Sequence, residues 1–230
     1  TSATYRQDSK SSPALAEKDP ENILLARGRR YRLRAEVIRD NALSSSGLLV
    51  RKIGGAPVRP YEVAVSFKPL KRDKGEGLYR RSLYTFWKRT APAPVMMSLD
   101  ASKREVCTVR RERTSSPLQA LVLMNDPQLV EAARILGQRL LKKHAENSAA
   151  MLGEMFRMLT GRKPGDSEKK ILNRLYKEQL DFFQTNPEQA KNFLKTGDAA
   201  ADKELAPARL AAAGAVANVL LNFDEAVMKR

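Results

Sequence analysis

Residues 116–143, SPLQALVLMNDPQLVEAARILGQRLLKK, decide the fold class of this chain. They contain two helix starts in succession, a Ser-Pro pair at 116–117 and an Asp-Pro pair at 126–127. A short polar side chain followed by proline is typical of the N-cap and first position of an α-helix. Apolar residues then recur at helical spacing, namely Leu129, Ala132, Ala133, Leu136 and Leu140. We therefore predict helices over 117–124 and 127–143, the second with one buried face.

The helical pattern continues to the end of the chain, where capping residues and breakers divide it into four further segments. The predicted helices lie around Met151–Leu159, from Asp166 or Ser167 to about Leu180, from Pro187 to about Gly197, and from about Glu204 to Leu221. Pro117, Pro127 and Pro187 should each lie in the first turn of a helix. The last helix is rich in alanine, and its small faces suit close packing in the core.

The first half of the chain has a weaker pattern. Asp19-Pro20 predicts the start of a short helix that ends near Arg27, and a second helix is predicted over 32–45. Glycine and proline interrupt residues 51–77, which we predict as a loop, although 61–67 alternates enough to allow a short strand. Residues 78–89 are compatible with either a helix or a strand.

These patterns together predict a mainly α-helical, multi-helix fold. We expect residues 1–230 to form one domain, in which a loop-rich basic part, 1–115, packs on a helical part, 116–230. The chain opens without an initiator methionine, so we expect it to be the C-terminal fragment of a larger protein. No apolar run is long enough to span a membrane.

The net charge of +16 is distributed unevenly. Residues 1–115 contain 25 Lys and Arg against 12 Asp and Glu, a net charge of +13, whereas residues 116–230 contain 17 against 14, a net charge of +3. A basic field of this size favours anionic partners, among them nucleic acid, anionic lipid, acidic polysaccharide and acidic protein. A single cysteine excludes an intrachain disulfide.

Six blocks of the sequence carry a family resemblance. They are TSATYRQ (1–7), DPENILLARGRRYRLRAEVIRDNALSSSGLL (19–49), KIGGAPVRPY (52–61), YRRSLYTFWKRTAPAP (79–94), DASKREVCTVRRERTSSPLQALVLMNDPQLVEAAR (100–134) and TGRKP (160–164). In these blocks the chain resembles the planctomycete-type PSD1 family, a domain of unknown function (DUF1553). The resemblance extends over nearly the whole chain.

The resemblance implies a cellular setting and no mechanism. Members of the family are typically large exported proteins in which a cytochrome-c-like module and a second uncharacterised module precede this one. The expected location is therefore periplasmic or otherwise extracytoplasmic. The expected partner is the upstream cytochrome-c-like module, with a c-type haem elsewhere in the parent protein and no cofactor in this chain. The family supplies no catalytic residues to transfer.

Arginine runs at 27–34 and 110–113 are the strongest charge features. The planar guanidinium group binds carboxylate, sulfate or phosphate through two hydrogen bonds at once. Together with the arginines at 80–81, these runs could form one anion-binding face. We predict that some of its candidate residues converge in space, namely Arg30, Arg80, Arg81, Arg110, Arg111 and Arg113. The alternative is that each arginine pairs with a local carboxylate or is solvated.

Aromatic residues alternate with cations between Tyr79 and Arg89, and Tyr84 and Trp87 are candidates for stacking on a base or a sugar ring. The favoured alternative is that this segment contributes to the core, in which case Trp87 should be largely buried against the helices after Ser116.

Two single residues have reactive side chains. Cys107 lies among arginines that would lower a thiol pKa, but we favour a buried, unreactive cysteine. His144, the only histidine, lies where the predicted helix ends, and we interpret it as a helix C-terminal cation rather than a haem ligand. The common metalloprotease, phosphate-loop and serine-hydrolase motifs are absent. We predict neither catalytic residues nor a metal site.

The sequence leaves three functions open. We favour a non-catalytic binding or assembly module that engages an anionic ligand or partner, for example an acidic or sulfated polysaccharide. The first alternative is an enzyme domain that acts on acidic polysaccharide together with upstream modules. The second is nucleic-acid binding, which the charge favours and an exported setting disfavours.

Overall fold

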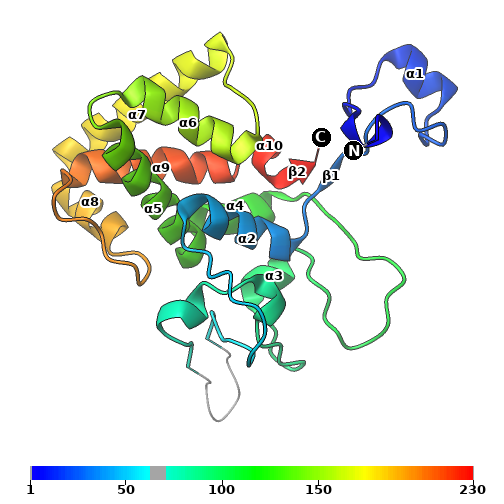
Figure 1. Cartoon of the computed structure of the whole chain (residues 1–230), viewed down its shortest axis with the longest axis horizontal. Helices are drawn as coiled ribbons and strands as arrows, with labels where there is room; N and C mark the ends of the chain where they lie inside the picture. Colours follow the sequence, from blue (N-terminus) through cyan, green and yellow to red (C-terminus); the bar gives the residue numbers. More distant parts are fainter. Residues whose placement is uncertain (1, 63–70, 230) are drawn as a thin grey trace.

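The computed structural model describes residues 2–62 and 71–229, and the fold is mainly α-helical, as predicted (Figure 1). The elements in chain order are η1 (Thr4–Arg6), α1 (Pro13–Lys18), β1 (Tyr31–Arg32), α2 (Ala35–Ser46), η2 (Gly75–Leu78), η3 (Ser82–Tyr84), α3 (Pro94–Ser98), α4 (Pro117–Asn125), α5 (Pro127–His144), α6 (Ser148–Thr160), α7 (Asp166–Thr185), α8 (Pro187–Leu194), α9 (Pro207–Leu221), α10 (Asp224–Val227) and β2 (Met228–Lys229). Within the described residues, no helix has the length and apolarity needed to cross a membrane.

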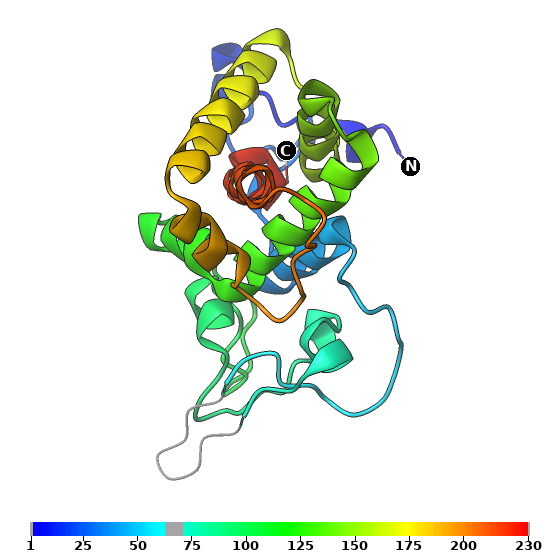
Figure 2. The ribbon, with the colours of Figure 1, turned by 90° about the vertical axis from the view of Figure 1, so that its left-hand side faces the viewer.

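Helix α9 forms the centre of the larger hydrophobic core, and Figure 2 shows it end-on with other helices around it. Four of its alanines are fully buried, namely Ala211, Ala212, Ala213 and Ala217. As a result, neighbouring helices approach its backbone closely. The closest approach is to α5, where a Cβ added at Gly137 would lie 2.8 Å from the backbone nitrogen of Gly214. Small residues on both helices therefore set the distance between α5 and α9.

A second, smaller core lies where α2, α3 and α4 meet the first turns of α5. It contains Ile38, Met96, Leu123 and Leu129, with Trp87 packed against it. Because α5 contributes to both cores, it connects the helices of the second half to the shorter elements of the first half.

The prolines begin helices where the sequence predicted. Pro117, Pro127 and Pro187 each occupy the first turn of a helix, which confirms that prediction. The Asp126 side chain accepts hydrogen bonds from the backbone nitrogens of Gln128 and Leu129 and so caps α5. Burial raises the pKa of this carboxyl group, against the lowering effect of those hydrogen bonds.

The helix predicted from Asp19-Pro20 does not form, and that prediction was wrong. The Asp19 carboxylate accepts hydrogen bonds from the backbone nitrogens of Ile23 and Leu24, which closes a turn. Asn22 then has a φ of 57°, in the left-handed region, so a helix cannot propagate through it. The helix nearby is α1, which starts earlier at Ser12-Pro13.

Residues 78–89 form neither of the predicted regular structures but two 3₁₀ turns, η2 ending at Leu78 and η3. Isolated β-bridges to Val50 and Val58 and side chains of α2 satisfy part of the backbone here. The Arg39 guanidinium donates to the carbonyls of Leu78 and Arg80 at 2.7 and 2.9 Å, and Asp40 accepts from the Ser82 nitrogen. The possible strand over 61–67 falls mostly outside the described residues.

Candidate functional site: a basic cleft

A cleft of about 1940 Å³ lies between the N-terminal segment, residues 108–115 and strand β2. In Figure 1 the N-terminal segment and the loop before α4 project to the same side of the helices, and both contribute residues to the cleft. Nine cationic residues line it, namely Arg27, Arg29, Arg30, Arg32, Arg34, Arg110, Arg111, Arg113 and Lys229. Among the described residues only two acidic side chains, Glu21 and Glu112, line it as well.

Two of these arginines have a structural role. Arg32 is buried, and its guanidinium donates to the carbonyls of Leu33, Leu99 and Thr114 and to the Asp100 carboxylate. Arg27 donates to backbone carbonyls of its own segment, those of Asp19 and Pro20 both at 2.8 Å. These guanidinium groups hold the walls of the cleft in place and are not available to a ligand.

Two further arginines are paired with carboxylates. Arg30 contacts Asp224 at 2.8 Å, and Arg111 contacts Glu36 at 2.8 Å. Both pairs join segments that are far apart in sequence, and both are partly exposed. Exposed pairs contribute little to stability, so an anionic ligand can compete for these arginines.

Cations also stack on the tyrosines of the cleft. The Arg113 guanidinium lies 4.4 Å from the centre of the Tyr31 ring, and Lys229 Nζ lies 4.9 Å from the Tyr5 ring and 5.8 Å from the Tyr31 ring. Such contacts hold the cations in place while leaving their hydrogen-bond donors available.

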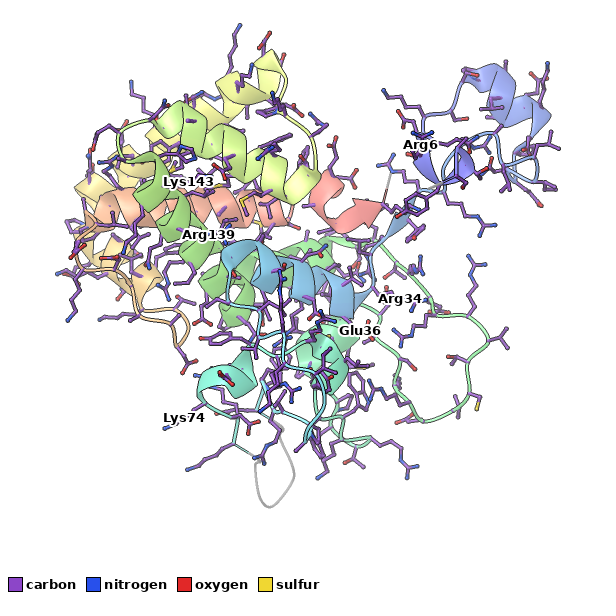
Figure 3. All side chains as sticks on the ribbon, in the orientation of Figure 1. Arg6, Arg34, Glu36, Lys74, Arg139 and Lys143 are labelled. Carbon is purple, nitrogen blue, oxygen red and sulfur yellow. The ribbon has the colours of Figure 1, made fainter. Side chains whose placement is uncertain are left out.

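The remaining three arginines, Arg29, Arg34 and Arg110, are exposed. Within residues 2–62 and 71–229, none of them forms an ion pair with a carboxylate. Figure 3 shows Arg34 at the amino end of α2, close to Glu36, which pairs with Arg111. A ligand can bind these three without breaking an existing contact, and Arg113 and Lys229 can bind it while they stay stacked on the tyrosines.

Most residues of this cleft lie in the part of the chain that matches a protein-family model. A model of the PSD1 family, described as "Protein of unknown function (DUF1553)", matches residues 1–176, which is more than half of the chain. The chain belongs to the PSD1 family. The matched span contains every cleft residue except Met228 and Lys229. No curated protein and no solved structure gives a significant match to the chain.

Four of the six arginines predicted for the anion site, Arg30, Arg110, Arg111 and Arg113, line this PSD1 cleft. Arg80 lies elsewhere, because it is buried and donates to the carbonyls of residues 52, 54 and 56. Arg81 is exposed but is not a cleft residue. Four of the six candidates thus line one cleft, and the two from residues 80–81 lie outside it.

The aromatic residues predicted for stacking are also outside the cleft. The Arg80 guanidinium covers the Tyr84 ring at 3.9 Å, and the Tyr84 hydroxyl accepts a hydrogen bond from the Gly54 nitrogen. Trp87 is partly buried, and Arg104 lies 4.9 Å from its ring. Trp87 packs against the second core, which includes Leu123 and Leu129 from the helices after Ser116, as predicted. The cleft instead contains Tyr5 and Tyr31.

No sequence pattern indicated that Lys229 is a cleft residue, and the pairing of β1 with β2 places it there. Tyr31 pairs with Lys229 and Arg32 pairs with Met228. The arginine run at 27–34 was a visible signal, but nothing in the sequence showed that the last residues of the chain lie beside it.

Asp100 connects two walls of the cleft through hydrogen bonds to Arg32 and Thr114. Its Oδ2 accepts hydrogen bonds from Arg32 Nη2 at 2.6 Å, from the Thr114 nitrogen at 2.7 Å, from Thr114 Oγ1 at 2.8 Å and from Gln119 Nε2 at 3.2 Å. One carboxylate thus joins both ends of the 100–114 loop to the opposite wall. Burial raises the pKa of Asp100, but the hydrogen bonds from Thr114 and Arg32 outweigh it and lower the pKa overall.

His144 is the last residue of α5, and its Nε2 lies 2.5 Å from Glu154 Oε2. Lys143 contacts the other oxygen of the same carboxylate at 2.6 Å. Hydrogen bonds from Lys143 and His144 lower the pKa of Glu154. Within the described part of the chain, no group of three or more His, Cys, Asp and Glu side chains could hold a metal ion.

Cys107 is exposed, so the prediction that it is buried was wrong. It lies in the loop that joins Asp100 to Thr114, and the apolar environment expected for it does not exist there. We predict that Cys107 of the native protein reacts with a thiol reagent at a rate within a factor of about ten of its rate in the unfolded chain. The reason is that burial normally protects a cysteine, and Cys107 is exposed. Labelling followed by mass spectrometry measures this rate, and Cys107→Ser is the blank. Labelling a hundredfold slower than in denaturant contradicts the exposed position.

Proposed function

We propose that this chain is a non-catalytic binding module that holds an extended anionic ligand in the basic cleft. The observation that carries the proposal is the ratio of nine cationic to two acidic side chains along the cleft among the described residues. Among the described residues, six of those cations form no ion pair with a carboxylate, which supports binding over the alternative in which every arginine is locally neutralised. They are Arg27, Arg29, Arg34, Arg110, Arg113 and Lys229.

The size of the cleft favours a polymer over a single small anion. About 1940 Å³ exceeds the volume of a typical small-molecule pocket by roughly a factor of two to six. The cations are spread over three chain segments and do not converge on one point, so they fit repeated negative charges. An acidic or sulfated polysaccharide has such charges, and it is the ligand that we propose.

The setting forms part of the same proposal. We propose an extracytoplasmic location, in a parent protein whose upstream cytochrome-c-like module carries the c-type haem and is the partner of this chain. The support for this setting is the sequence resemblance to exported PSD1 proteins.

The test of the binding proposal is a pair of triple variants of equal charge. Arg29→Gln, Arg34→Gln and Arg110→Gln together remove the three exposed cleft arginines that form neither an ion pair nor a ring contact within the described residues. Arg51→Gln, Arg81→Gln and Arg89→Gln together remove three exposed arginines that do not line it. We predict that the cleft variant binds a sulfated glycan about a hundredfold more weakly at 0.1 M salt, since each lost contact leaves roughly one counterion unreleased. The control variant should lose much less.

Affinity is measured by titration calorimetry over a series of salt concentrations, with a sulfated glycan, a polyuronate and a DNA duplex of matched charge. The slope of log affinity against log salt should fall by about three in the cleft variant. Equal losses in the two triple variants would show that only net charge matters and would overturn the cleft. A strong preference for one DNA sequence would instead favour the nucleic-acid alternative.

A further inference from the structure

Two loops on either side of the cleft expose aliphatic side chains to solvent. In the turn after α1, Ile23 and Leu24 are 75% and 77% exposed. In the loop before α4, Val106 and Val109 are also exposed. Both loops project away from the helices on the same side of the molecule (Figure 1). Exposed apolar residues that recur on one side of a protein mark a site of interaction with another body.

The first loop holds its aliphatic residues outward by specific contacts. The buried Asp19 carboxylate accepts from the nitrogens of Ile23 and Leu24 at 2.7 and 2.9 Å, which fixes both backbones. Leu25 has a φ of 53°, a left-handed conformation that is unfavourable for leucine. Backbone strain of this kind is often found at functional sites, so the strained Leu25 beside the exposed Ile23 and Leu24 suggests a functional role for this turn.

The second loop is anchored at its two ends. Asp100 binds Thr114, and the Trp87 indole donates to the carbonyl of Lys103 at 3.0 Å. The exposed valines lie between these anchors, at 106 and 109, and arginines 104 and 110 lie immediately beside them in sequence.

We propose that these two loops dock the protein on the surface of an anionic lipid bilayer. The aliphatic residues at 23–24 and at 106 and 109 would enter the boundary between the headgroups and the acyl chains. The arginines next to them would lie at the level of the anionic headgroups, which is the arrangement found in proteins that bind membrane surfaces.

The distribution of side chains favours a bilayer over an acidic protein partner. A protein interface places apolar residues in its centre and polar residues at its rim. Here the centre is the charged cleft, and the exposed apolar residues lie on the projecting loops at its edges, where Val109 also lines the cleft. Only a deformable apolar medium can accept both loops while the charged cleft stays hydrated.

Vesicle co-sedimentation tests the proposal, with vesicles of phosphatidylcholine alone and with about a third of phosphatidylglycerol. The test variants are Ile23→Ser with Leu24→Ser, and Val106→Ser with Val109→Ser. The control is Ile53→Ser with Leu83→Ser, which replaces two aliphatic residues that are equally exposed but are not in the docking loops. We expect the wild type and the control to bind the anionic vesicles, and each test variant to bind at least about tenfold more weakly.

Three results would overturn the proposal. These are no binding of the wild type to anionic vesicles, equal losses in the control and test variants, or binding that salt abolishes and that the serine variants leave unchanged. The last result would mean that the arginines act alone. The outcome is independent of the glycan test, because serine replacements in the loops keep every arginine of the cleft.

Discussion

Asp100→Asn is expected to lower the free energy of unfolding by about 2 kcal/mol at neutral pH. The variant leaves the guanidinium of Arg32 without the carboxylate that balances its charge, and it places an amide where four donors now converge. Removing one partner of a fully buried ion pair costs about 3–5 kcal/mol. We expect less here because the Asp100 side chain is 22% exposed.

Asparagine is the appropriate replacement because Asp100 has a φ of 58°, which asparagine tolerates and alanine does not. The matched control is Asp8→Asn, which removes an exposed carboxylate whose contacts are with the neighbouring residues Ser9 and Lys10. Urea unfolding should show a change below about 0.5 kcal/mol for this control. An equal, small effect of both changes would mean that Asp100 does not hold the cleft.

The effect of Asp100→Asn depends on pH. The folded protein lowers the pKa of Asp100, so the ionised carboxylate stabilises the fold at all pH values above its unfolded pKa of about 3.9. This contribution is lost as the pH falls through the lower, folded pKa. The difference between wild type and variant should therefore be full at pH 7 and shrink steadily below about pH 4. In the same variant the glycan should bind more weakly at pH 7, since the loop that carries Arg110 loses its anchor.

Gly137→Ala should destabilise the protein by about 1–3 kcal/mol, the usual cost of adding a group to a well-packed core. The new methyl group would lie 2.8 Å from the Gly214 nitrogen and 2.9 Å from the Ala213 carbonyl carbon. Both are backbone atoms of α9, and neither can move unless the helix moves. Helices α5 and α9 would have to separate.

The control for this change is Gly153→Ala in α6, where no atom lies within 4 Å of the added methyl group. Alanine is the better helix former by roughly 0.8–1 kcal/mol, so this variant should be slightly more stable than the wild type. Thermal and urea unfolding of the two variants therefore shift in opposite directions. A Gly137→Ala protein as stable as the wild type would show that α5 and α9 are not in close backbone contact.

Local signals in the second half of the chain predicted its helices well. Each Ser-Pro, Asp-Pro or Asn-Pro pair there marks a helix start, since proline can occupy the first helical turn at no cost but not the interior. The same rule failed at Asp19-Pro20, although the residue types are similar. There the Asp19 side chain binds nitrogens four and five residues ahead, and this turn replaces the helix.

The candidate site could be predicted only in part. The arginines at 30 and 110–113 line one cleft, as their charge and clustering suggested. Arg80, from an equally basic stretch, is instead buried in contact with backbone carbonyls. Charge density in the sequence does not distinguish an arginine that binds a ligand from one that binds its own chain, because a guanidinium donates equally well to both.

The sequence by itself determined the helical fold class, the small-residue centre of α9 and the strong basic charge of the first 115 residues. These follow from spacing, capping and composition, which act over a few residues. Only the tertiary structure decided which cations share a cleft, because β1 pairs with β2 and thereby brings Lys229 beside Tyr31 across nearly 200 residues. The same holds for Asp100, which acquires its role from partners at 32, 114 and 119. Contacts at such separations depend on how the packed helices arrange the loops between them, and no local pattern encodes that arrangement.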